Sequence, residues 1–73
     1  MAMKDRDLAQ AERLTAECKN RIANQREVIA NAFQKGHDTD VAVSLLRAFE
    51  ASLQAFEKHR QLIRAWRDRA ERR

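Results

Sequence analysis

The chain has 73 residues, with 15 Lys or Arg against 11 Asp or Glu, so its formal net charge is +4. It contains no Pro and one Gly, which excludes a sandwich or barrel of many short strands joined by tight turns. A single Cys excludes an intramolecular disulfide framework and a cysteine-based zinc module. No apolar run approaches the roughly 20 residues of a membrane span, and no signal-peptide pattern opens the chain. We therefore expect a single all-α unit in the cytoplasm, without membrane contact.

The first predicted helix covers about residues 5–35. Apolar and small residues recur there at spacings of three and four, and polar residues occupy the opposite face. This heptad pattern predicts an amphipathic helix that buries one face against a second helix. The residues of this seam are Leu8, Ala11, Thr15, Cys18, Ile22, Gln25, Ile29 and Ala32.

The only glycine, Gly36, marks the predicted end of this helix. A residue directly after a helix often adopts positive φ, which glycine does without a steric penalty. Asp38 or Thr39 then supplies an N-terminal cap, and Asp40 places negative charge in the first turn of a new helix. Residues 36–39 are therefore predicted to form one helix–helix turn.

The second predicted helix covers about residues 40–70. One row repeats every seven residues, and a second row is expected to complete the seam toward the first helix. The first row is Ala42, Phe49, Phe56, Ile63 and Ala70, the second is Leu45, Ser52, His59 and Trp66, and Leu46 and Leu53 widen the stripe. A turn this short makes the two helices antiparallel neighbours, and the numbers of facing residues then sum to about 75. We predict one antiparallel, coiled-coil-like hairpin over residues 1–73.

The chain has few large hydrophobic residues for the core of an isolated hairpin. By count, 13 of the 32 hydrophobic residues are Ala, and 15 are Leu, Ile, Val or Phe. The apolar stripes are also wider than a two-helix seam needs. A second copy could cover this surplus, so we expect a homo-oligomer, most simply a dimeric four-helix bundle. The residues predicted for the core and oligomer interface are Ile22, Ile29, Leu46, Phe49, Leu53, Phe56 and Ile63.

A string of residues around the turn resembles a known family. It consists of Gln25-Arg26, Gly36-His37-Asp38-Thr39, Ala42, Leu45-Leu46, Phe49-Glu50, Leu53, His59-Arg60 and Ile63. This string, within residues 8–65, resembles an uncharacterised family of short helical-hairpin proteins common in rhizobia and related alphaproteobacteria. The resemblance implies a bacterial, cytoplasmic helical hairpin, and it implies no activity, so no catalytic residue carries over.

Two groups of side chains could carry chemistry. His37, Asp38 and Asp40 are possible metal ligands in the turn, although helix capping asks for the same residue types. Cys18 and His59 could form a nucleophilic pair, although a buried Cys usually serves as a small hydrophobe. We favour capping and packing over chemistry, and expect no enzyme activity, cofactor or metal.

The charge distribution is the strongest lead toward function. Residues 36–57 carry one Arg against four carboxylates, net −3, whereas residues 58–73 carry seven Lys or Arg against two carboxylates, net +5. A basic stripe on a helix is typical of nucleic-acid binding. The candidate contacts are Arg60, Arg64, Arg67, Arg72 and Arg73. We favour a small self-associating interaction module that binds a partner protein, with nucleic-acid binding as the alternative.

Overall fold

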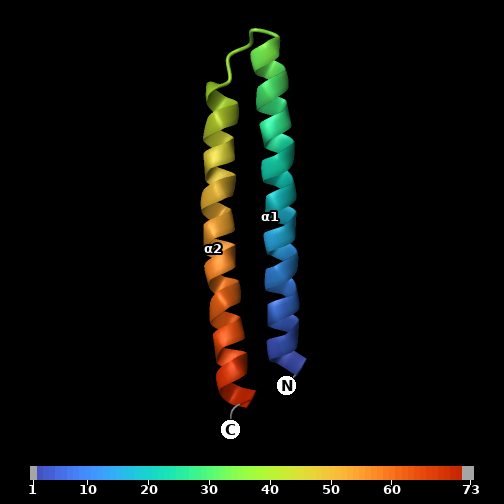
Figure 1. Ribbon diagram of the computed structural model, residues 1–73, viewed down its shortest axis with the longest axis vertical. Helices are drawn as coiled ribbons and strands as arrows, with labels where there is room; N and C mark the ends of the chain where they lie inside the picture. Colours follow the sequence, from blue (N-terminus) through green and yellow to red (C-terminus); the bar gives the residue numbers. More distant parts are fainter. Residues whose placement is uncertain (1, 72–73) are drawn as a thin grey trace.

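Two long α-helices form an antiparallel hairpin. The computed structural model describes residues 2–71, and the side chains from residue 6 onward. Helix α1, Ala2–Gln34, and helix α2, Asp40–Glu71, lie side by side along their whole length (Figure 1). The Cα atoms extend over 59 × 15 × 13 Å, and their radius of gyration is 16.9 Å. A globular chain of this length has a radius of gyration of about 11 Å. The predicted all-α hairpin is confirmed, and its rod shape leaves every side chain near the surface.

The helix bounds follow the sequence pattern closely. The end of α1 and both ends of α2 lie within one residue of the predicted positions. The start of α1 differs, because helix already begins at Ala2 instead of about residue 5. No Pro or Gly precedes Leu8, so nothing in the chain opposes helix in this segment.

The turn closes α1 with a Schellman motif. Gly36 has φ of 75°, the left-handed conformation. The N–H of Gly36 donates to the carbonyl of Phe33 at 3.0 Å, and the N–H of His37 donates to the carbonyl of Ala32 at 2.9 Å. These two bonds satisfy carbonyls that the helix end would otherwise leave free. The predicted role of Gly36 is therefore confirmed.

Of the two residues predicted to cap helix α2, Asp38 provides the side-chain hydrogen bond. The Asp38 carboxylate accepts a hydrogen bond from the N–H of Asp40 at 2.9 Å. The Thr39 carbonyl accepts from the N–H of Val43 at 2.8 Å, the first bond of the new helix. Asp40 stands in the first turn, where its charge favours the helix dipole.

We expect Gly36→Ala to lower the free energy of unfolding by about 1–2 kcal/mol, because an L side chain is strained at positive φ. A Cβ at this position would meet nothing within 4 Å, so the cost comes from the backbone alone. Urea denaturation monitored by circular dichroism measures the change. Gly36→Asn is the control, because Asn tolerates this conformation better and should lose less. Equal losses in the two variants would contradict this account of the turn.

The seam between the helices, here called the inner seam, runs from the turn to the open end. Its α2 residues alternate at spacings of three and four, and all are buried or half-buried: Ala42, Leu46, Phe49, Leu53, Phe56, Arg60, Ile63 and Arg67. The prediction that Leu45, Ser52, His59 and Trp66 complete this seam is wrong, because all four side chains are exposed. At the open end, Leu8 packs in a buried cluster with Ala11 and Ile63, and Trp66 is 59% exposed.

Two ion pairs report the register of the hairpin. Arg26 pairs with Glu50 at 3.5 Å, and Arg64 pairs with Glu12 at 3.7 Å. The residue numbers of each pair sum to 76, in agreement with the predicted sum of about 75. The side chains of both pairs are roughly half exposed, so each pair contributes less than about 1 kcal/mol to stability. The pairs therefore show which residues face each other, but they contribute little to fixing that register.

Candidate interaction surface

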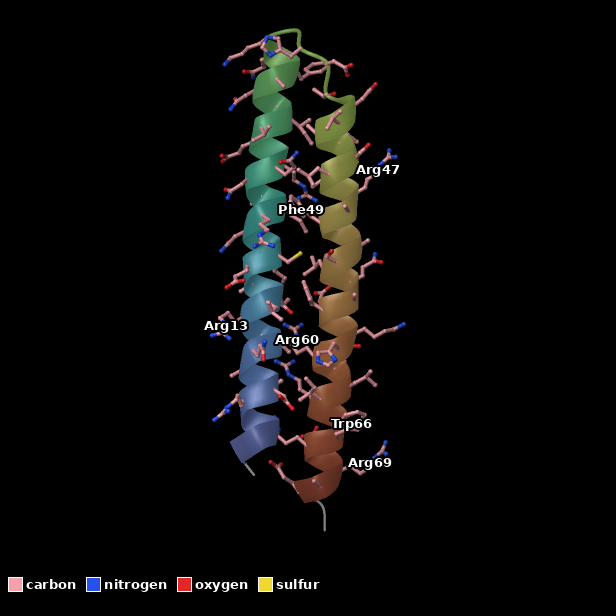
Figure 2. The ribbon with its side chains drawn as sticks, turned by 180° about the vertical axis from the view of Figure 1, so that it is seen from behind. Arg13, Arg47, Phe49, Arg60, Trp66 and Arg69 are labelled. Carbon is pink, nitrogen blue, oxygen red and sulfur yellow. The ribbon has the colours of Figure 1, made fainter. Side chains whose placement is uncertain are left out.

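The residues predicted for the core and interface all lie in the inner seam. Ile22 and Ile63 are buried, and Ile29, Leu46, Phe49, Leu53 and Phe56 are half-buried. Figure 2 shows Phe49 between the two helices. The seven residues thus hold α1 against α2. As a group they form the interior of the hairpin, so a free association surface has to be sought elsewhere.

Polar side chains inside the inner seam are hydrogen-bonded to backbone carbonyls. Thr15, 2% exposed, donates from Oγ1 to the carbonyl of Ala11 in its own helix at 2.8 Å. Gln25 donates from Nε2 across the seam to the carbonyl of Ala42 at 2.9 Å. A bond that crosses between helices has one favourable register, so Gln25 helps to set how α1 lies on α2.

Among the side chains considered for chemistry, Cys18 and Asp38 make hydrogen bonds that hold the fold. Cys18 is buried, and its thiol lies 3.2 Å from the carbonyl of Phe49, which accepts its hydrogen bond. His59 is exposed. In the turn, Asp38 caps α2 as described, and His37 is exposed. Within residues 6–71, no three His, Cys, Asp or Glu side chains are placed to hold a metal ion.

One long side of the hairpin, here called the charged side, carries the ion pairs. On this side, side chains of opposite charge face each other across the two helices: Arg26 faces Glu50, and Glu12 faces Arg64. An open groove on this side is lined by Lys19, Ile22, Ala23, Arg26, Glu50, Leu53, Gln54 and Glu57. Five of these eight residues are polar or charged. The groove is therefore a solvated edge of the hairpin with mutually compensated charges.

The predicted nucleic-acid contacts are divided among different environments. Arg64 is engaged with Glu12. Arg60 and Arg67 are half-buried in the inner seam, and each has a buried Nε without a hydrogen-bond partner among the described residues. Figure 2 shows Arg60 between the helices. Arg72 and Arg73 lie outside the described residues. Arg60, Arg64 and Arg67 therefore do not form a row of free guanidinium groups along one face of α2.

A second heptad row follows α2 outside the inner seam. It is the inner seam shifted back by one residue, and we call it the outer stripe. Its members are Val41, Leu45, Ala48, Ser52, Ala55, His59, Leu62 and Trp66, and all eight are exposed. Its four large apolar side chains are between 45% and 85% exposed. Figure 2 shows Trp66 directed away from α1. The outer stripe is an apolar surface that the hairpin itself leaves uncovered.

The outer stripe lies on the side of the hairpin opposite the charged side. In an antiparallel helix pair, like flanking positions of the heptad face each other. The flank of α1 opposite Glu12 and Arg26 carries Leu14, half-buried, and Val28, 52% exposed. These two residues border the outer stripe. The hairpin therefore has one charged side and one apolar side.

Comparison with protein-family models, with curated proteins and with solved structures finds no match to this chain. The resemblance to the rhizobial family stays a prediction. Within the described residues, neither helix contains a segment long and apolar enough to cross a membrane.

Proposed function

We propose that this protein is a small non-enzymatic helical module that self-associates and then binds a partner protein. The assembly is a homodimer in which two hairpins form a four-helix bundle. A cytoplasmic location belongs to the same proposal, and it is supported by one buried Cys without a disulfide partner.

The observation that carries this proposal is the contrast between buried and exposed apolar residues. Only five apolar side chains in the described part of the chain are buried: Leu8, Ala11, Cys18, Ile22 and Ile63. Six large hydrophobic side chains, Val28, Phe33, Val41, Leu45, Leu62 and Trp66, are at least 45% exposed. Chains of this size rarely reach useful stability from so small a core without a disulfide, a metal or a second subunit. A second copy supplies the missing burial.

Nucleic-acid binding has less support. It requires a free basic face on α2, but Arg64 is paired with Glu12, and Arg60 and Arg67 are turned into the inner seam. A phosphate-binding surface needs several guanidinium groups free at once.

Sedimentation equilibrium tests the proposal. We expect the mass of a dimer, with a dissociation constant in the micromolar range, and a thermal midpoint that rises with protein concentration. A monomeric mass at a few hundred micromolar, about 100-fold above that range, would overturn the self-association. The same samples titrated with bulk RNA or DNA at low salt should show no shift in a gel.

A further inference from the structure

We infer that the outer stripe of α2 is the self-association surface, and that it pairs with the outer stripe of a second copy in antiparallel orientation. The inference rests on the proposed self-association and names the surface, the partner and the orientation. The partner is an identical chain.

The angle between the outer stripe and the inner seam around the axis of α2 is close to the angle between neighbouring contacts in a four-helix bundle. One residue corresponds to about 100° around an α-helix, so the outer stripe points about 100° away from the inner seam. In a square four-helix bundle, each helix meets its two neighbours at about 90°. Helix α2 therefore presents two apolar contact faces at nearly the angle that a four-helix bundle requires, and it forms the apolar contact between the two hairpins.

Helix α1 offers no equivalent second face. Its row shifted back by one residue is mainly polar, and it consists of Asp7, Gln10, Leu14, Glu17, Arg21, Asn24, Val28 and Asn31. Burying that row against an apolar stripe would leave polar groups without partners, at a cost for each. The outer stripe of α2 is instead matched by its own copy, which makes the contact isologous and closes the assembly at two chains.

The order of side chains along the outer stripe fits an antiparallel two-fold contact. With the two-fold axis near residues 53 and 54, Leu45 of one copy faces Leu62 of the other, and Val41 faces Trp66. Ser52 faces Ala55 at the centre. Small residues at the crossing point let two helices approach closely, while the large residues at both ends bury apolar surface.

Charge along α2 selects the antiparallel orientation. Divided at the two-fold axis, residues 40–53 of α2 carry one Arg against two carboxylates, net −1, and residues 54–67 carry four Lys or Arg against one carboxylate, net +3. Antiparallel pairing sets each acidic half against a basic half of the other copy. Parallel pairing would set like against like twice, and the two helix dipoles would add instead of opposing each other. Charge complementarity thus identifies a second copy as the occupant.

The test compares one substitution on two sides of the hairpin. Ala55→Glu places a carboxylate at the centre of the outer stripe, and Ala30→Glu places one on an exposed position of α1 away from it. Both replace an exposed helical Ala by a good helix former, so both hairpins should fold. We expect sedimentation equilibrium to show that Ala55→Glu raises the dissociation constant of the dimer about 100-fold or more, and that Ala30→Glu changes it by less than about three-fold.

Leu62→Glu is a second variant on the outer stripe, and it should dissociate the dimer in the same way. Wild-type protein that is dimeric, with both stripe variants equally dimeric, would overturn the assigned surface and leave the proposed self-association intact. Wild-type protein that is monomeric throughout would overturn the proposed function itself. The two failures are therefore distinguishable.

Orientation is read from one spin label for each chain. In a Cys18→Ala background, a label at Ala65→Cys lies about 11 residues from the two-fold axis. At 1.5 Å rise for each residue, the two labels of an antiparallel dimer are separated by roughly 35 Å along the axis. In a parallel dimer they would lie within about 20 Å, since helix axes pack 8–10 Å apart. The longer distance supports the inference, and the shorter one overturns the antiparallel orientation.

Discussion

Phe49→Glu will abolish most of the helical structure of this protein at room temperature. Phe49 lies in the middle of the inner seam, between the helices, and its carbonyl accepts the thiol of Cys18 (Figure 2). Removing a packed Phe costs roughly 3–5 kcal/mol, and a carboxylate placed in the seam adds the cost of its own desolvation. Proteins of about 70 residues are typically stable by only about 4–11 kcal/mol. The substitution removes most of that margin.

Far-ultraviolet circular dichroism and thermal melting measure this effect. The control is Ala51→Glu, which introduces the same charge two residues away at an exposed position of α2. We expect a change of less than about 0.5 kcal/mol for the control. A Phe49→Glu variant with wild-type helicity and a thermal midpoint within a few degrees of wild type would show that the inner seam does not hold the hairpin together.

Ile63→Ala will destabilise the free end of the hairpin, so that this end unfolds locally while the end at the turn stays folded. Ile63 is 6% exposed and packs with Leu8 and Ala11, the only buried cluster described at that end. The lost side-chain volume costs about 2–4 kcal/mol, because a long two-helix rod has no neighbouring layer that can collapse into the cavity. A loss of this size lowers the thermal midpoint by about 10 °C or more in a domain this small.

Amide hydrogen exchange locates the opening. We expect faster exchange in residues 8–15 and 60–67, with little change near Ile29 and Leu46, because a rod opens from its free end in local steps. Gln61→Ala, at an exposed position two residues away, is the control and should leave exchange unchanged. Uniform acceleration along both helices would indicate that the hairpin unfolds as one cooperative unit.

Much of the fold could be predicted from the residues alone. The seam pattern of α1 and the seven-residue repeat of Phe49, Phe56 and Ile63 predict two long helices. Gly36 predicts the turn, because only one residue in the chain adopts positive φ without strain. The position of the turn then sets the register, which the Arg26–Glu50 pair confirms.

The candidate surface was harder to predict. The heptad pattern predicts Leu45 and Trp66 inside the inner seam, and it assigns no role to Val41 and Leu62. The signal was nevertheless present, since all four belong to one row with spacings of four and three. Two heptad rows run along α2 one residue apart, so that Ala48 and Ala55 of the outer stripe directly precede Phe49 and Phe56 of the inner seam. Periodicity shows which residues share a face, but it cannot show which of two faces meets the other helix.

The sequence by itself therefore determined two helices, their turn and their register, because these depend on local backbone preferences and on the position of one glycine. Only the tertiary structure decided the rotation of α2 about its own axis. That rotation pairs Glu50 with Arg26 and Arg64 with Glu12, and it brings the carbonyls of Ala42 and Phe49 to Gln25 and Cys18. A turn of α2 by one residue position, about 100°, would break all four contacts. The same rotation turns the outer stripe outward, where a second chain can reach it.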